Sequence, residues 1–225
     1  MRKNIYVHDV TKLKKKNTFK QNIVDIKEGL KYVYNTKEIL YLIIISSFVN
    51  FFLAGYNLFL PYTNFTFKSV SENMYSNVLV AESVGGIIGA FINGKVLKNI
   101  STKALVSFLF VSGLSLVLFP TISLISKNMI IDIIPIMLFQ CSLTIFNIQF
   151  MSIIQTIVDY NYIGRVFSVI FTISVLFMPL GTYFFSCFFN TKSVYGYYFL
   201  GIGVVCCSIL AILLGKNKTL DVSGE

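Results

Sequence analysis

Residues 75–94 read YSNVLVAESVGGIIGAFING, an apolar stretch that carries one carboxylate, Glu82, closely followed by the glycines Gly85, Gly86 and Gly89. Its length matches the roughly 20 residues with which a helix crosses the roughly 30 Å hydrocarbon core of a bilayer. Because that core offers the backbone no water to bond, such a stretch must be helical. The stretch therefore predicts a membrane-spanning helix with one polar face.

Five further apolar runs of similar length follow this pattern, at residues 39–60, 104–125, 130–157, 166–189 and 194–214. Only 13% of the 225 residues are charged and 55% are hydrophobic, whereas roughly a quarter of a soluble domain is charged. The sequence thus predicts an all-α integral membrane protein. It has a six-helix transmembrane domain at 39–215, a basic cytoplasmic linker at 1–38 and a cytoplasmic tail at 216–225.

Lysine and arginine are concentrated before the first run, where residues 1–38 hold ten of the 19 in the chain. On the same side of the predicted membrane lie Lys95, Lys98, Lys103, Arg165, Lys216 and Lys218, whereas the other side holds Lys68, Lys127 and Lys192. Basic loops stay cytoplasmic, so we expect a multi-pass protein of the plasma membrane with both termini inside. This bias accounts for the net charge of +9, and no nucleic-acid partner is expected.

Residues that perform catalysis or bind metals follow no recognisable pattern in this sequence. The four cysteines lie inside apolar runs without metal-ligand spacing, and the single histidine, His8, has no partner motif. Nucleophile and phosphate-binding motifs are also lacking. We therefore expect no enzyme activity, no cofactor and no metal site.

The segment before the first run has apolar residues at helical spacing, namely Phe19, Ile23, Ile26, Leu30, Val33 and Tyr34. Lys20, Lys27 and Lys31 lie mostly away from this stripe. One interpretation is an amphipathic helix on the inner membrane surface, with anionic lipid favoured by the basic residues upstream. A solvated linker is the other interpretation, and the sequence leaves both open.

Glu82 shares one helical face with Gly86, Gly89 and Asn93, with Gly85 nearby. A carboxylate at mid-membrane costs about 3 kcal/mol on an insertion scale, so we expect this face to be directed into protein or a water-filled cavity. The glycines would permit close helix approach. Glu82 could couple transport to a proton or contact a cation, or it could be a buried carboxyl that only locks helices together.

Three other runs carry polar stripes at helical spacing. They are Ser46, Asn50, Ala54, Asn57 and Pro61; Gln140, Thr144, Asn147, Met151 and Gln155; and Ser168, Thr172, Pro179, Thr182 and Ser186. Such stripes can line a cavity or form bonds between helices, and Gln149 faces away from the second one. Pro179 is expected to kink its helix, as part of a gate or for packing. The runs at 104–125 and 194–214 contain no amide or charge, so four spans are polar and two are not.

Several short motifs resemble the C-terminal half of a major facilitator superfamily transporter, closest to the macrolide-efflux-like drug-exporter branch. They are Asp25-Ile26-Lys27-Glu28-Gly29-Leu30-Lys31-Tyr32 before Asn35-Thr36-Lys37, Leu60-Pro61, Gly85-Gly86-Ile87-Ile88-Gly89 before Lys95 and Lys98, Gly164-Arg165-Val166-Phe167-Ser168, and Pro179-Leu180-Gly181. The resemblance extends from about Phe19 onward. It departs from the family at Asn93, where an acidic residue is usual.

The resemblance implies one half of a twelve-helix fold in which the four polar spans line the cavity and the other two pack outside. It also implies proton-coupled efflux, by an antiporter, of a small amphiphilic compound. The substrate and coupling residues would be Glu82, Asn50, Asn57, Gln140, Asn147 and Gln155, and the packing or gating residues Gly85, Gly86, Gly89, Pro179 and Arg165. Arg165 would contact the missing half on the inner side, pair with Asp159, or both.

Three interpretations of the whole chain remain open. It could be a fragment or split-gene product that requires a missing N-terminal half, or a six-span protein that pairs with a second copy or a separate half. It could also be a membrane accessory or immunity protein with no transport activity of its own.

Overall fold

The computed structural model describes residues 19–97, 100–126 and 128–215, with side chains from residue 24 to residue 214 of these ranges. Within them, six helices are long and apolar enough to cross a membrane. They are α2 (Lys37–Phe59), α4 (Met74–Lys95), α5 (Thr102–Ile125), α6 (Met129–Ile157), α7 (Ile163–Phe188) and α8 (Tyr195–Gly215). Each coincides with a predicted run to within three residues at either end. The described part of the chain is therefore all-helical, with six helices that have the length and composition of membrane spans.

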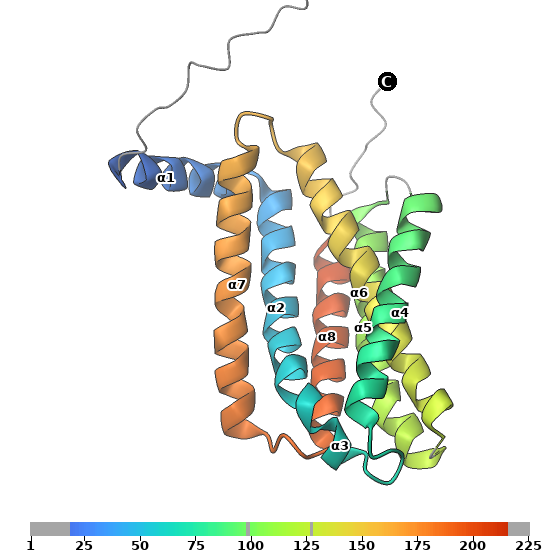
Figure 1. Ribbon diagram of the computed structural model, residues 1–225. Helices are drawn as coiled ribbons and strands as arrows, with labels where there is room; N and C mark the ends of the chain where they lie inside the picture. Colours follow the sequence, from blue (N-terminus) through green and yellow to red (C-terminus); the bar gives the residue numbers. More distant parts are fainter. Residues whose placement is uncertain (1–18, 98–99, 127, 216–225) are drawn as a thin grey trace, which may run out of the picture.

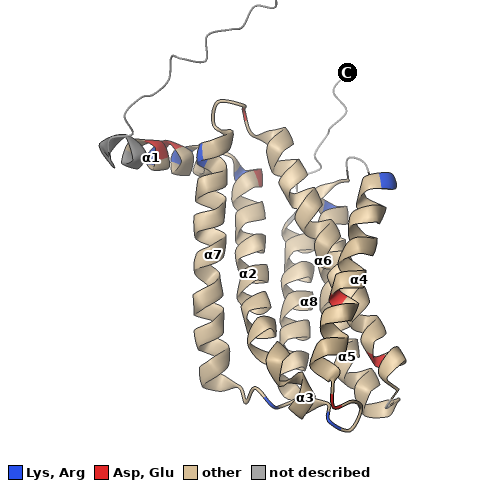
Figure 2. Ribbon diagram, in the orientation of Figure 1, with Lys and Arg blue, Asp and Glu red and all other residues tan. Residues whose placement is uncertain are grey.

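Three shorter elements lie at the two ends of the bundle. Helix α1 (Phe19–Asn35) lies at the end at which α2 begins and projects sideways past α7, while η1 (Leu60–Tyr62) and α3 (Thr63–Thr66) form the turn at the opposite end (Figure 1). The charged residues lie mainly at these ends and in the connections, with few along the spans (Figure 2). The predicted linker thus contains a helix, whereas residues 1–18 and the tail at 216–225 lie outside the described residues.

The six spans pack in the order α4, α6, α5, α8, α2, α7, and every contact between successive helices is extensive except the smaller one between α8 and α2. Helices α4 and α7 lie on the two flanks of the bundle (Figure 1). Only 22% of the most apolar window of each is buried, compared with 33–56% for the other four spans. The two flanking helices are therefore the least covered parts of the bundle.

The order of these contacts is unchanged when α2, α4 and α5 are exchanged for α6, α7 and α8, although the α2–α8 contact is smaller than its counterpart α5–α6. The α4–α6 contact then becomes α7–α2, the α6–α5 contact becomes α2–α8, and the α5–α8 contact maps onto itself. Equivalent helices run in opposite directions through the bundle (Figure 1). This order of contacts is the one expected of an inverted repeat of three plus three helices.

Glycines bring the backbones of α4 and α6 together. A Cβ atom on Gly89 would lie 2.5 Å from the carbonyl oxygen of Cys141, and one on Gly85 would overlap the carbonyl oxygen of Met137. Both glycines are buried. Small residues at such positions allow the close approach that drives helix association in lipid.

Glycines also contact helix backbone between α7 and α2 and between α5 and α8. A Cβ atom on Gly181 of α7 would overlap the carbonyl oxygen of Phe51 on α2. At the α5–α8 contact, a Cβ atom on Gly201 would lie 2.8 Å from the carbonyl oxygen of Gly113, and one on Gly113 would lie 3.0 Å from that of Gly201. Each of the helix pairs α2/α7, α4/α6 and α5/α8 thus has a glycine that lies close to the backbone of the other helix.

We expect Gly89→Ala to lower the thermal unfolding midpoint in detergent micelles, because the added methyl group meets backbone that cannot rotate away. Overpacking of this kind costs about 1–3 kcal/mol. Gly94→Ala is the matched control, since Gly94 lies on the same helix with nothing within 4 Å of its Cβ position. Equal midpoints for the two variants would contradict the close α4–α6 contact.

Candidate functional site

Glu82 on α4 accepts a hydrogen bond from a residue of α2. The Tyr56 hydroxyl donates to Glu82 Oε1 at 2.6 Å. Tyr56 is 2% exposed, whereas Glu82 is partly buried. The hydrogen bond therefore joins a central helix of the bundle to a flanking one and holds the carboxylate inside the transmembrane domain.

Tyr56 is itself fixed by aromatic neighbours from two other helices. Its ring centroid lies 4.9 Å from that of Phe139 on α6 and 6.4 Å from that of Tyr197 on α8. Such packing leaves the hydroxyl little freedom to turn away from Glu82. The sequence analysis missed Tyr56 because a tyrosine in an apolar run is indistinguishable from a core residue. The one available signal was that a buried tyrosine hydroxyl needs a partner.

The predicted amide residues of α2 lie in two different environments. Asn57 is exposed, but Asn50 is partly buried and its Nδ2 donates to the Ser46 carbonyl oxygen at 2.9 Å. The hydroxyls of Ser174 on α7 and Ser46 lie within hydrogen-bond distance, at 3.2 Å. One part of this stripe therefore packs against α7, whereas Asn57 remains open to the surroundings.

The stripe on α6 divides in a similar way. Asn147 and Gln155 are exposed, while Gln140 and Thr144 are partly buried beside α4. A Cβ atom on Gly86 would lie 3.7 Å from Thr144 Oγ1 and 3.8 Å from Gln140 Cγ. The structure thus brings Gly86 and Gln140 together, and it gives Asn147 and Gln155 a separate, open position.

The stripe on α7 is exposed along its whole length, at Ser168, Thr172, Pro179, Thr182 and Ser186. Thr182 and Ser186 donate to carbonyl oxygens of their own helix. Helix α7 continues from Ile163 to Phe188 with Pro179 inside it. The exposed middle of α5 and of α8 is instead formed by apolar residues and a cysteine, at Leu114, Leu118, Ile202, Cys206, Ile209 and Leu210.

Gln149 lies on the other side of α6 from the polar stripe and is buried. Its Nε2 donates to Asn93 Oδ1 at 2.6 Å and to the Leu97 carbonyl oxygen at 3.1 Å. Asn93 occupies the position at which the resemblance has an acidic residue. Here it accepts a hydrogen bond from a neutral amide, which ties the end of α4 to α6.

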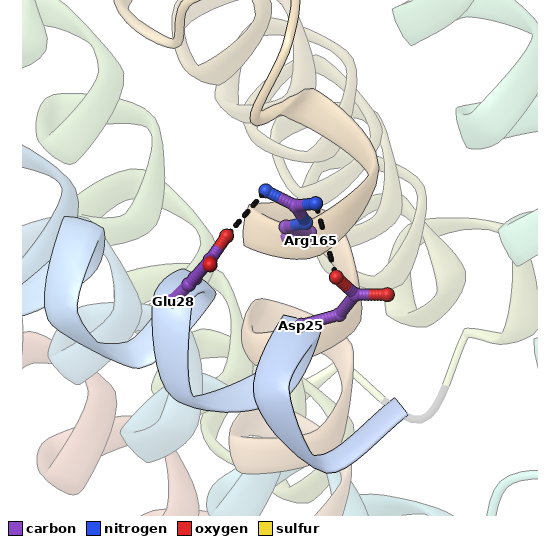
Figure 3. A network of polar contacts seen from close by, with 3 residues as sticks. All are labelled: Asp25, Glu28 and Arg165. Carbon is purple, nitrogen blue, oxygen red and sulfur yellow. Dashed lines mark hydrogen bonds and ion pairs between the residues drawn. The ribbon is translucent and has the colours of Figure 1, made fainter. Parts of the chain in front are cut away.

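Arg165, in the first turn of α7, forms ion pairs with helix α1. Its Nη2 lies 3.0 Å from Asp25 Oδ1 and its Nη1 lies 2.6 Å from Glu28 Oε2 (Figure 3). The expected pair with Asp159 is wrong, since Asp159 instead accepts a hydrogen bond from the Tyr32 hydroxyl at 3.4 Å. Sequence proximity suggested the loop partner, but α1 folds back over the start of α7 and supplies nearer carboxylates.

Asp132 is a second acidic residue inside the bundle, which the sequence analysis passed over in favour of Glu82. It is 0% exposed in the first turn of α6, and the Ser126 hydroxyl donates to its Oδ1. Within the described chain, its Oδ2 has no hydrogen-bond partner. A carboxylate is favoured in the first turn of a helix, and the preceding Asn128, which caps α6, was the signal available in the sequence.

Metal chemistry finds no support in the side chains that the structure describes, where no three His, Cys, Asp or Glu residues gather to hold an ion. The four cysteines are free. The polar groups described within the spans include the Tyr56–Glu82 pair, the buried Asp132, and the exposed amides and hydroxyls of α2, α6 and α7. Comparisons with family models, curated proteins and solved structures found no match to this chain.

We expect Tyr56→Phe to destabilise the bundle, because it leaves a partly buried carboxylate without its donor. Hydrogen bonds to charged groups contribute about 1.5–3 kcal/mol, measurable as a lower thermal midpoint. Tyr197→Phe is the matched control, since Tyr197 is 0% exposed and its hydroxyl has no partner among the described residues. Equal losses in the two variants would show that the Tyr56 hydroxyl contributes nothing through Glu82.

Proposed function

We propose that this chain forms one half of a secondary active transporter of the major facilitator type. Its activity would be proton-coupled efflux of a small amphiphilic compound. The observation that carries the proposal is the order of the helix contacts, which is the order expected of the three-plus-three inverted repeats from which such transporters are built. A second half, from another chain or a second copy, completes the transport pathway.

The distribution of exposed polar groups supports a missing second half. Apolar side chains on α4 and α7 could face lipid without cost, because lipid tails are as apolar as leucine. The exposed polar residues on α7, together with Asn57, Asn147 and Gln155, are less suited to that environment. A second six-helix unit that covers α4 and α7 would enclose these groups in a pathway between the two units.

Glu82 is the proton-carrying residue of this proposal. Its carboxylate lies within the membrane domain, where ionisable side chains usually mark proton or ion pathways. The Tyr56 hydroxyl fixes the position of one carboxylate oxygen. Alternating access would expose this group to each side of the membrane in turn, with the α1 end of the bundle on the cytoplasmic side because basic residues flank it.

An accessory or immunity protein without transport activity is the second candidate. The Tyr56–Glu82 hydrogen bond favours it, since a carboxyl satisfied by a neighbouring helix can serve packing alone. The two candidates differ in what replacement of Glu82 does to transport.

We expect Glu82→Gln to abolish proton-driven uptake of ethidium into inside-out vesicles made from the cells that contain the chain, with any partner present. The amide keeps a hydrogen-bond acceptor for Tyr56 but carries no exchangeable charge. Glu72→Gln, at an exposed residue between α3 and α4, should transport as the unsubstituted chain does. Ethidium uptake that persists in Glu82→Gln, with the same protein level, would contradict the coupling role.

Photo-crosslinking tests the second half directly. A benzophenone amino acid at Val175 on α7 should form a protein adduct, with a second copy or a different membrane protein, in native membranes. The same reagent at Ile202 on α8 should label lipid, although the two side chains are equally exposed at 52% and 53%. Protein adducts at neither site, or equally at both, would count against a partner on the α4/α7 side.

A further inference from the structure

We infer that α1 is a membrane-surface helix that binds the anionic headgroup layer of the bilayer crossed by its own bundle. The inference is independent of transport, because it concerns the apolar and basic sides of α1 alone. It also decides between the two interpretations that the sequence leaves open for this segment.

One side of α1 is fixed against α7. A Cβ atom on Gly29 would lie 3.0 Å from the Arg165 carbonyl oxygen and 3.1 Å from Val169 Cγ2, and Val33 is 3% exposed. Tyr32 stacks on Tyr162 with ring centroids 4.9 Å apart. These contacts, with the Arg165 ion pairs (Figure 3), hold α1 in one orientation about its own axis.

The bundle leaves a second side of α1 uncovered, and this side is apolar. Ile26, Leu30 and Tyr34 follow one another at four-residue spacing, which places them on one face. They are 50%, 45% and 76% exposed. Such a face on a helix fixed beside a membrane domain matches the helices that lie in the headgroup–acyl boundary.

Lysines border this apolar face on the side away from α7. Lys27 and Lys31 are both exposed. At 100° per residue, Lys27 lies beside Tyr34 at the border of the apolar face, and Lys31 lies on the outermost side of the helix. Arg165 offsets the carboxylates of Asp25 and Glu28. The exposed side is therefore basic, and each lysine near an anionic lipid surface strengthens binding to it.

Chain connectivity identifies the bilayer as the occupant. Helix α1 ends at Asn35 and the first span begins at Lys37, so a single residue separates the two helices. Because α1 also runs sideways from the start of α2 past α7, roughly perpendicular to the spans (Figure 1), its apolar face is held at the level where the spans leave the membrane. Lipid is thus the neighbour that this face meets first.

The chain contains no tryptophan, which allows depth to be measured with one reporter. We expect the fluorescence of Leu30→Trp in nanodiscs to be quenched strongly by lipids brominated on their acyl chains. Val24→Trp should be quenched weakly, although Val24 is similarly exposed at 42%, because it lies about 120° around the helix from Leu30. Equal quenching at the two positions, or none at Leu30, would overturn the inference.

A second arm tests the preference for anionic lipid. Quenching of Leu30→Trp should increase when phosphatidylglycerol replaces part of the phosphatidylcholine. The additional Lys27→Gln and Lys31→Gln substitutions should remove that increase while circular dichroism stays unchanged. Quenching that does not change with the fraction of phosphatidylglycerol would contradict a contact between the lysines and anionic lipid. An increase that persists in the variant with both substitutions would contradict it as well.

Discussion

Close approach of helix backbones at glycine is the constraint on which the rest of this structure depends. Lipid provides no hydrophobic force between apolar helices, so association relies on packing and on bonds between helices. Gly89 supplies such an approach for α4, Gly181 for α7, and Gly113 with Gly201 for the central pair. These contacts occur in α4/α6 and in its counterpart α7/α2, as well as between α5 and α8. The same packing places Tyr56 within reach of Glu82.

Polar side chains of the spans form two groups, those that make hydrogen bonds between helices and those that are exposed on the surface of the bundle. Gln149 donates a hydrogen bond to Asn93, and Tyr56 donates one to Glu82. Asn147 and Gln155, by contrast, are exposed although they belong to a span. The first group stabilises one six-helix unit, and the second is the reason for proposing another unit beside it. Helix α1 adds a third type of contact, the ion pairs that join it to Arg165 of α7. The apolar face of α1 is not covered by the bundle.

The positions of the spans were predictable because a bilayer demands about 20 apolar residues in helical form, and periodicity also indicated a helix in α1. Side-chain partners were less accessible. Proximity in the sequence suggested Asp159 as the partner of Arg165. In the structure α1 packs against the start of α7 and places Asp25 and Glu28 beside Arg165. Tyr56 could not be chosen among 13 tyrosines without the helix order, and Asp132 was overlooked because it lies in the first turn of its span. The cavity predicted from the polar stripes stays a prediction, as do the substrate and the direction of transport.

The central claim is that this six-helix unit functions against a second one across α4 and α7. Electron cryo-microscopy of the chain, extracted in polymer nanodiscs from the cells that contain it, tests this most directly. The account predicts twelve transmembrane helices, with the second unit against α4 and α7, and with α5 and α8 facing lipid. A particle with six helices and lipid around both α4 and α7 would contradict it.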